Sequence, residues 1–490
     1  MNIKIYKNII INYLPILLAI LSFIIRIIPH AFIMQYAGLE EGGLINYCNL
    51  LLAGNFTNVG LTPHLHIFIA CAIHLITGIS IEHSAYIVAP LFAALSTYVF
   101  YYVLRDAVKT DTPWIGTLLF VFLESHNYRS VLFGTGYESL AIFIMMMFIY
   151  VYSTKNKLYS IPLFIKLPFA HIYAFAFVCM FLLVDQFVLK YGITKKTIFA
   201  SAILFFIVVV LFVTVLPYKL AIIDMFIQFK SVSFLLKFNL LAGRFVPVLT
   251  TEFLGTTLLF FISVFHFYKE RDNISYIIVF LIPAMVIFTL VSSTHISPSR
   301  LLIYAGILGI MSFSKLKLGR TLAFALIVIM LVQTVYVGWD NNLHIYNHTT
   351  KDEIEMLDWL IQYDPLISHY NIVWDDIGKQ TLLIKCPDIY AIDKNFSASS
   401  YSKIDFEKYT EYKDLLQKGN LTTIENDTTY TMNLHYVMYT NRFRDNALLM
   451  LQTEYGMLYS EQSIKDMWHN STYWKIIYES EHGKIYEKIG

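Results

Sequence analysis

The chain has 490 residues, of which 57% are hydrophobic and 14% are charged, with a mean hydropathy of +0.57. These values exclude a soluble domain of this length and are typical of a multi-pass membrane protein. The net charge of +1 combines two unlike regions, because residues 1–339 carry 22 basic and 12 acidic side chains whereas residues 340–490 carry 14 and 23. We therefore predict a helical membrane domain over 1–338 and an acidic, water-exposed α/β domain over 339–490.

Apolar runs in the first region are long enough, or nearly so, to cross a hydrocarbon core of about 30 Å. They lie at 9–29, 84–104, 139–154, 171–189, 197–217, 251–268, 274–294, 301–314 and 321–338, with shorter runs at 113–123 and 158–168. Basic clusters recur at every second boundary, which places the N-terminus in the cytoplasm and predicts about 11 transmembrane helices in the plasma membrane. The stretch 158–189 barely suffices for two crossings, so we expect a short or tilted hairpin near Pro168 and His171.

This topology leaves outer segments at 30–83, 124–138, 218–250 and 295–300, with the C-terminal domain on the same side. The apolar stretch 62–80 is expected to form a helix lying at the membrane interface. Seven of the twelve acidic residues of the first region fall on this outer face: Glu40, Glu41, Glu82, Glu124, Glu138, Asp224 and Glu252. A carboxylate near hydrocarbon costs roughly 2.5 to 3.5 kcal/mol on insertion scales, so their gathering indicates a functional site.

The C-terminal region has the pattern of an α/β domain. Helical periodicity surrounds 353–363, strand-like runs follow at 370–374 and 381–384, and 474–489 alternates like a hairpin around His482-Gly483. The four cysteines, Cys48, Cys71, Cys179 and Cys386, have no C-x-x-C spacing and no obvious pairing. Their spacing therefore indicates neither a zinc site nor a disulfide framework and says nothing about the redox compartment.

Candidate catalytic residues lie in the first two outer loops. Glu40 and Glu41 stand on a glycine-rich turn, where a carboxylate can act as a general base or bind a divalent cation, although one of them can equally be solvated or cap the next helix. Arg129 and Glu138 flank the second loop and could hold a phosphate and a metal together. Glu138 also suits the first turn of the helix that follows, where the macrodipole favours a negative charge.

Two later positions add charge on the same face. Arg300, at the outer end of an apolar helix, could bind a lipid phosphate or serve as a snorkelling anchor. Glu252 stands at a helix entrance, where capping explains it nearly as well as a binding role. His126 is expected to be an interfacial residue with a satisfied side chain rather than a metal ligand.

Together these loops resemble the GT-C superfamily of membrane glycosyltransferases, and within it the catalytic subunit of oligosaccharyltransferases and its single-subunit archaeal and bacterial relatives. The resemblance implies that Glu41, with Glu40 as its substitute, coordinates the metal and engages the acceptor. The stretch from Arg129 to Glu138 is similar to the family's second-loop arginine and D-x-D-like motif. Here the partner acid is missing, because Ser139-Leu140 follows Glu138.

Three further stretches carry the likeness. Arg300, followed by an aliphatic run and Tyr304, resembles the family's donor-phosphate contact. Glu252 matches the glutamate of a T-x-x-E motif whose threonine is replaced by Leu249. The stretch 373–378 resembles the W-W-D-Y-G signature and assigns acceptor binding to Trp374 and Asp375, although a buried tryptophan beside a turn is the alternative.

The resemblance implies an enzyme that transfers a sugar from a polyprenyl phosphate or diphosphate carrier to a protein, lipid or glycan acceptor on the outer face. Glu41 would orient or deprotonate the acceptor, Glu41 and Glu138 would hold Mg²⁺ or Mn²⁺ as the one expected cofactor, and Arg300 and Arg129 would neutralise the leaving phosphate. The alternatives are a transferase of single sugars from a polyprenyl monophosphate, a non-catalytic relative, and a lipid or glycan transporter. No nucleotide-binding glycine loop is present, and no nucleic acid partner is expected.

Overall fold

The computed structural model describes residues 3–32, 45, 48–49, 51–52, 54, 65–127, 136–188, 253–291, 298–339, 350–367, 372–374, 385, 420–425, 428–433, 435–441 and 472–489. The chain divides into two compact units. The helical unit consists of Met1–His30 and Cys48–Asp340, and the tail unit consists of Ala31–Tyr47 and Asn341–Gly490.

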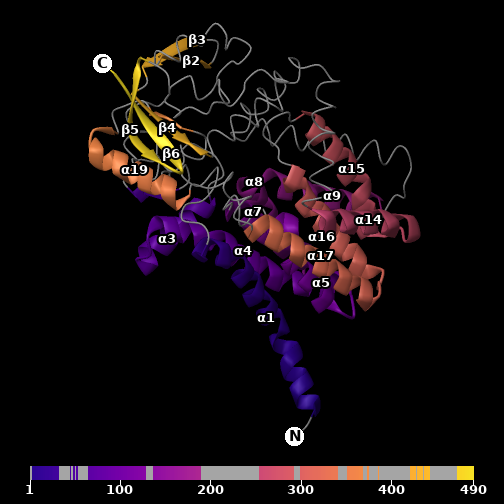
Figure 1. Ribbon diagram of the computed structural model, residues 1–490. Coiled ribbons are helices and arrows are strands. Elements are labelled where there is room, and N and C mark those ends of the chain that lie inside the picture. Colours follow the sequence, from indigo (N-terminus) through magenta and orange to yellow (C-terminus); the bar gives the residue numbers. More distant parts are fainter. Residues whose placement is uncertain are drawn as a thin grey trace. The chain divides into compact units, whose positions relative to one another are not determined.

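The helical unit consists of helices at the positions of the apolar runs (Figure 1). They are α1 (Ile3–Phe32), α3 (Leu65–Thr77), α4 (Ile81–Tyr102), α5 (Pro113–Val121), α7 (Gly136–Thr154), α8 (Ile161–Ala170), α9 (Ile172–Leu183), α14 (Leu254–Lys269), α15 (Asn273–Val291), α16 (Pro298–Lys315) and α17 (Arg320–Trp339). Every predicted run is thus helical except 197–217, which lies outside the described residues.

One helix in the described part of the chain is long and apolar enough to cross a membrane, His83–Val108, with 26 residues. This helix extends beyond the end of α4 because a π-helical turn, Val103–Val108, continues the chain in helical form. The helix ends at Lys109, whose φ is 62°. The other described helices contain shorter apolar stretches of 10–17 residues. The fold is therefore multi-helical as expected, and the number of crossings stays a prediction.

The expected break near Pro168 is present. Helices α8 and α9 contact each other and are separated by His171, whose backbone is extended with φ −167° and ψ 131°. At 1.5 Å per residue α8 is about 15 Å long and α9 about 18 Å, so neither alone matches a hydrocarbon core of about 30 Å. The break turns the chain at one residue and brings the His171 side chain into the interior of the unit.

One large apolar core joins helices α3 to α17, and a smaller cluster of Leu18, Ile25, Tyr101 and Val121 packs α1 against α4 and α5. Helix α4 packs along α7, α14 packs along α16, and α5 contacts α4, α16 and α17 (Figure 1). The approach of α14 to α16 is close, because a Cβ atom at Gly309 would overlap the backbone of Leu259. The core therefore determines which helix ends lie near one another.

The described residues of the tail unit include a four-stranded sheet and a helix. The strands are β1 (Ile372–Val373), β4 (Tyr436–Thr440), β5 (Trp474–Ser480) and β6 (Gly483–Lys488), in the order β1-β4-β6-β5, with β1 parallel to β4 and the other pairs antiparallel. Helix α19 (Lys351–Tyr363) begins with a capping box between Thr350 and Glu353. It packs on the sheet, where the Trp359 and Tyr478 rings lie 4.9 Å apart (Figure 1).

The predicted α/β pattern is thus confirmed for α19 and for the C-terminal hairpin, which turns at His482-Gly483. Of the run at 370–374, Ile372 and Val373 pair with β4, and residues 370 and 371 lie outside the described residues. The run at 381–384 lies outside the described residues. A second hairpin, β2 (Asn420–Glu425) with β3 (Thr428–Asn433), was not predicted.

Candidate active site

The predicted site residues fall into three groups in the structure. Glu40, Glu41, Arg129, Glu252 and Asp375 lie outside the described residues, so their placement stays a prediction. Arg300 lies in the first turn of α16, where only its backbone is described. Glu138 and Trp374 are described in full.

Glu138 lies in the first turn of α7 and is buried, with 2% of its surface exposed. In this position its carboxylate faces the positive end of the helix dipole, as the capping interpretation predicts. Its Oε1 atom lies 3.7 Å from Nε2 of His171, the residue between α8 and α9. A buried carboxylate and a buried imidazole are therefore brought together from two helices.

Tyr304 completes this cluster from a third helix, α16. Its hydroxyl lies 3.5 Å from Nδ1 of His171, so one imidazole faces both Tyr304 and Glu138. Arg300 precedes Tyr304 by four residues, about one helical turn. The structure thus joins two stretches of the sequence that were singled out separately, the end of the second loop and the start of α16. We call Glu138, His171 and Tyr304 the α7–α9–α16 cluster.

His171 was not among the site residues predicted from the sequence. The signal for it was present, because a histidine next to Pro168 interrupts an apolar run. Its pairing with Glu138, 33 residues earlier, is a property of the tertiary structure alone.

A second polar cluster begins the second loop, where Glu124, Ser125, His126 and Asn127 are all almost fully buried. The Glu124 carboxylate accepts a hydrogen bond from the backbone N–H of Thr256, in the first turn of α14. Asn127 Nδ2 donates to Thr334 Oγ1 of α17 at 2.9 Å. These contacts tie the start of the loop to two helices and so hold the segment that leads toward α7.

Arg26 anchors the same segment to α1. Its guanidinium is fully buried and donates through Nη1 to Ser22 Oγ, and through Nη2 to Nδ1 of His126 at 3.1 Å. Thr97 of α4 in turn donates to Ser22 Oγ at 2.9 Å. This agrees with the structural role expected for His126. Arg26 itself was missed, although it is the one charge within the run 9–29.

Trp374 directly follows β1 and is fully buried in the tail unit. Burial of the indole matches the alternative in which this tryptophan packs in the domain core. Its role in acceptor binding, like that of Asp375, stays a prediction.

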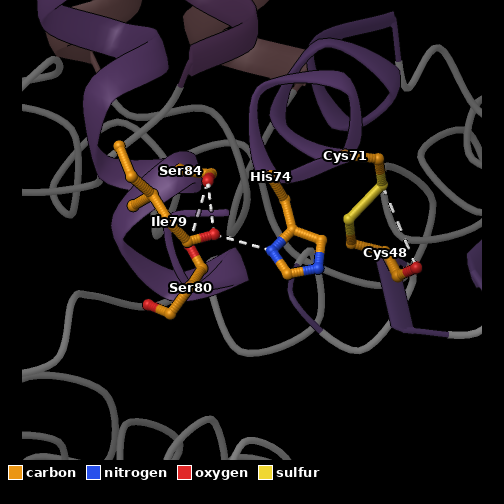
Figure 2. Close-up of a disulfide and its surroundings, with 6 residues drawn as sticks. All are labelled: Cys48, Cys71, His74, Ile79, Ser80 and Ser84. Atoms are coloured by element: carbon orange, nitrogen blue, oxygen red, sulfur yellow. Dashed lines mark hydrogen bonds between the residues drawn. A yellow bond between two sulfur atoms is a disulfide. The ribbon is translucent and has the colours of Figure 1, made fainter. Parts of the chain in front are cut away.

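The first loop contains a disulfide between Cys48 and Cys71 (Figure 2). The spacing of the cysteines did not indicate this pair, whose members are 23 positions apart in the sequence. His74 Nδ1 donates to the Ile79 carbonyl oxygen at 2.6 Å, a hydrogen bond drawn as a dashed line in Figure 2. The next residue, Ser80, is the N-cap of α4. Helix α3 is thus held at both the disulfide and its C-terminal end.

The outward surface of α3 is apolar. Phe68, Leu75 and Ile76 are exposed, whereas Ile67 and Cys71 are buried against the unit. One side of α3 packs against the unit and the other exposes apolar side chains. This arrangement suits a helix that lies at a membrane interface.

Comparison with known proteins gives a likeness in structure. No protein-family model and no curated protein matches the chain. Among solved structures, the oligosaccharyltransferase of Archaeoglobus fulgidus, crystallised in complex with Zn and sulfate, superposes with a TM-score of 0.52 at 12% identity, over 97% of this chain and 88% of that one. ArnT from Cupriavidus metallidurans bound to undecaprenyl phosphate matches with a TM-score of 0.38 at 10% identity, over 97% of both chains. The chain therefore shares its overall fold with the Archaeoglobus fulgidus oligosaccharyltransferase, the kind of protein that its loop motifs resemble.

Proposed function

We propose that this chain is a membrane glycosyltransferase that transfers a sugar or oligosaccharide from a polyprenyl phosphate or diphosphate carrier to a protein, lipid or glycan acceptor on the outer face of the membrane. The fold is compatible with many functions, so the proposal depends on the site. The observation that carries it is the convergence of Glu138, His171 and Tyr304 from three helices, one turn from Arg300.

His171 supplies the partner that the second-loop motif lacks. Two ligands of a tetrahedral cation about 2.1 Å away lie about 3.4 Å apart, close to the 3.7 Å between Glu138 Oε1 and His171 Nε2. If the Tyr304 hydroxyl accepts a hydrogen bond from Nδ1–H, the Nε2 lone pair faces Glu138. A nitrogen–oxygen pair suits Mn²⁺ or Zn²⁺ better than Mg²⁺, and a cation bound there would offset negative charge on the donor phosphate.

The charged residues of the loops would complete the reaction. The leaving group is a polyprenyl phosphate, whose charge grows as the glycosidic bond breaks, and Arg300 and Arg129 would bind its oxygens. Glu41, with Glu40 beside it, would orient the acceptor or take its proton. Glu252 and Asp375 would contact the acceptor, and buried Trp374 would hold the segment that carries Asp375 in place.

The disulfide supports the proposed location. Disulfides persist in oxidising compartments and are rare in the cytoplasm. The Cys48–Cys71 bond therefore favours an outer position for the first loop, which carries Glu40 and Glu41.

The test measures transfer of radiolabelled sugar from a native polyprenyl-linked donor pool by purified protein in lipid, with Mn²⁺, with Zn²⁺ and with a chelator. We expect Glu138→Gln and Arg300→Ala each to lower transfer roughly 10²–10³-fold, because the first removes a ligand of the cation and the second removes the guanidinium, and both positive groups would offset the negative charge that develops on the phosphate. His171→Ala should lower transfer and also abolish the dependence on added metal.

Asp111→Asn is the matched control, since Asp111 is an exposed carboxylate paired with Lys317 and should leave transfer unchanged. Equal transfer by wild type and Glu138→Gln would contradict the assigned site. No transfer by folded wild-type protein with peptide, lipid and glycan acceptors would favour a non-catalytic relative or a transporter.

A further inference from the structure

A second group of ionisable side chains lies at the opposite end of α14 from Thr256. It consists of His266 in the last turn of α14, Glu270 just after that helix, and Asp272 just before α15. Their nitrogen and carboxylate oxygen atoms all lie within 4.8 Å of one another. The group is far from the α7–α9–α16 cluster, since Tyr304 and Ser312, the α16 residues beside the two groups, are separated by eight residues, about 12 Å.

His266 is fully buried and its two ring nitrogens have different surroundings. Nδ1 lies 3.1 Å from Ser312 Oγ of α16. Nε2 has no hydrogen-bond partner and lies 3.6 Å from Asp272 Oδ2 and 3.8 Å from Glu270 Oε2. The serine contact therefore orients the ring so that Nε2 points at two carboxylates.

The Asp272 carboxylate is also fixed, through its other oxygen. Oδ1 accepts hydrogen bonds from the backbone N–H groups of Ile274 at 3.1 Å and Ser275 at 2.9 Å, and so caps α15. Oδ2 is buried without a hydrogen-bond partner. Two buried atoms that need a polar partner, Nε2 and Oδ2, thus face the same point.

These distances match those of a metal centre. Ligands about 2.1 Å from a tetrahedral cation lie about 3.4 Å apart, and the two distances from His266 Nε2 to the carboxylate oxygens, 3.6 and 3.8 Å, exceed this by only a few tenths of an ångström. The Glu270 side chain is 43% exposed, so water can reach the site and complete the coordination. With a neutral imidazole the ligands carry two negative charges, which suits a divalent cation.

We propose that His266, Glu270 and Asp272 bind one divalent transition-metal cation, of the Zn²⁺ or Mn²⁺ class. One imidazole nitrogen with two carboxylate oxygens suits these cations, whereas Mg²⁺ and Ca²⁺ prefer oxygen ligands throughout. The bound cation links the end of α14 to the start of α15 and, through Ser312, to α16. This site lies apart from the proposed catalytic centre and does not depend on the proposed glycosyl transfer.

The test measures metal content and thermal stability. Purified protein in lipid is dialysed against a chelator, loaded with Zn²⁺ or Mn²⁺, and analysed by elemental mass spectrometry and by thermal unfolding. We expect His266→Gln and Glu270→Gln each to bind one equivalent less than wild type, and to lose the rise in melting temperature that the metal gives wild type. Ser312→Ala should weaken binding roughly 10–100-fold, because it frees the imidazole to rotate.

Glu270→Gln is expected to fold like wild type, since the Glu270 side chain is 43% exposed to water. Asp111→Asn is the control at an exposed carboxylate and should keep the metal. His171→Ala separates the two centres, because it should leave this equivalent in place. Equal metal content in wild type, His266→Gln and Glu270→Gln would overturn the proposal. So would a melting temperature that depends on pH but not on metal, which would indicate an imidazolium paired with the two carboxylates.

Discussion

A single glycine illustrates how one residue determines helix packing in this protein. At Gly309 of α16 an added Cβ atom would overlap the carbonyl carbon and oxygen of Leu259 in α14. Backbone atoms cannot rotate away as a flexible side chain can, so the two helices would have to separate. Their separation matters beyond this contact, because α14 carries His266 and α16 carries Ser312 and Tyr304.

We expect Gly309→Ala to lower the free energy of unfolding by about 1–3 kcal/mol, the usual cost of overpacking a dense interior. Thermal unfolding of the purified protein in lipid measures this. Gly319→Ala is the matched control, because nothing lies within 4 Å of a Cβ atom there. If both variants melt at the wild-type temperature, the close approach of α14 and α16 is incorrect.

The residues of the α7–α9–α16 cluster also differ in how far the sequence predicts them. Glu138 could be singled out from its position before an apolar helix, but a histidine in an apolar run has no partner that the sequence identifies. Its partner emerges only when α7 and α9 pack together.

At the scale of elements, local signals in the tail unit are strong. Helix α19 begins where a threonine is followed three residues later by a glutamate, and both hydrogen bonds of the capping box form. The cap satisfies backbone N–H groups that have no partner within the first turn of a helix. The helix then packs its buried residues Ile354, Leu357 and Leu360 in the tail unit.

Thr350→Ala should therefore destabilise α19 by about 1 kcal/mol, since it removes the side-chain acceptor of the cap. Hydrogen exchange of the peptide covering 351–363 in the full-length protein would show faster exchange. Thr350→Ser, which keeps the hydroxyl, should exchange like wild type, and faster exchange in both variants would argue against the cap as the cause.

At the scale of the whole molecule, the disulfide offers a test of which face the first loop occupies. Cys48 and Cys71 are paired, whereas Cys179 is a free, buried thiol in α9. The disulfide therefore reports on the compartment of the first loop, and the free thiol reports on whether the protein is folded.

In a Cys386→Ser background, a membrane-impermeant maleimide added outside intact cells should label the pair only after treatment with an impermeant reductant. Cys48 and Cys71 are also buried in the folded protein, so their labelling depends on the loop opening once the disulfide is cut, whereas Cys179 should stay unlabelled because it lies in the large apolar core. Cys71→Ser is the control, since without the disulfide the loop should open and expose Cys48 to labelling without reduction. Labelling only after the cells are permeabilised would reverse the predicted topology.

The sequence alone identified most of the helices, the two regions of opposite charge and the C-terminal hairpin, because apolar run length, charge bias and alternation are local properties of the chain. It also pointed to Glu138 and to the start of α16, since a charge beside an apolar run is visible without a structure. The loop motifs were sufficient for the resemblance that the shared fold confirms.

Only the tertiary structure decided which of these residues meet. The pairs Glu138–His171 and Cys48–Cys71, and the group formed by His266, Glu270, Asp272 and Ser312, each combine separate segments. Their distances depend on how helices approach, as at Gly309, and on where the chain breaks, as at His171. Such contacts depend on packing between elements, which the periodicity of any one element does not encode.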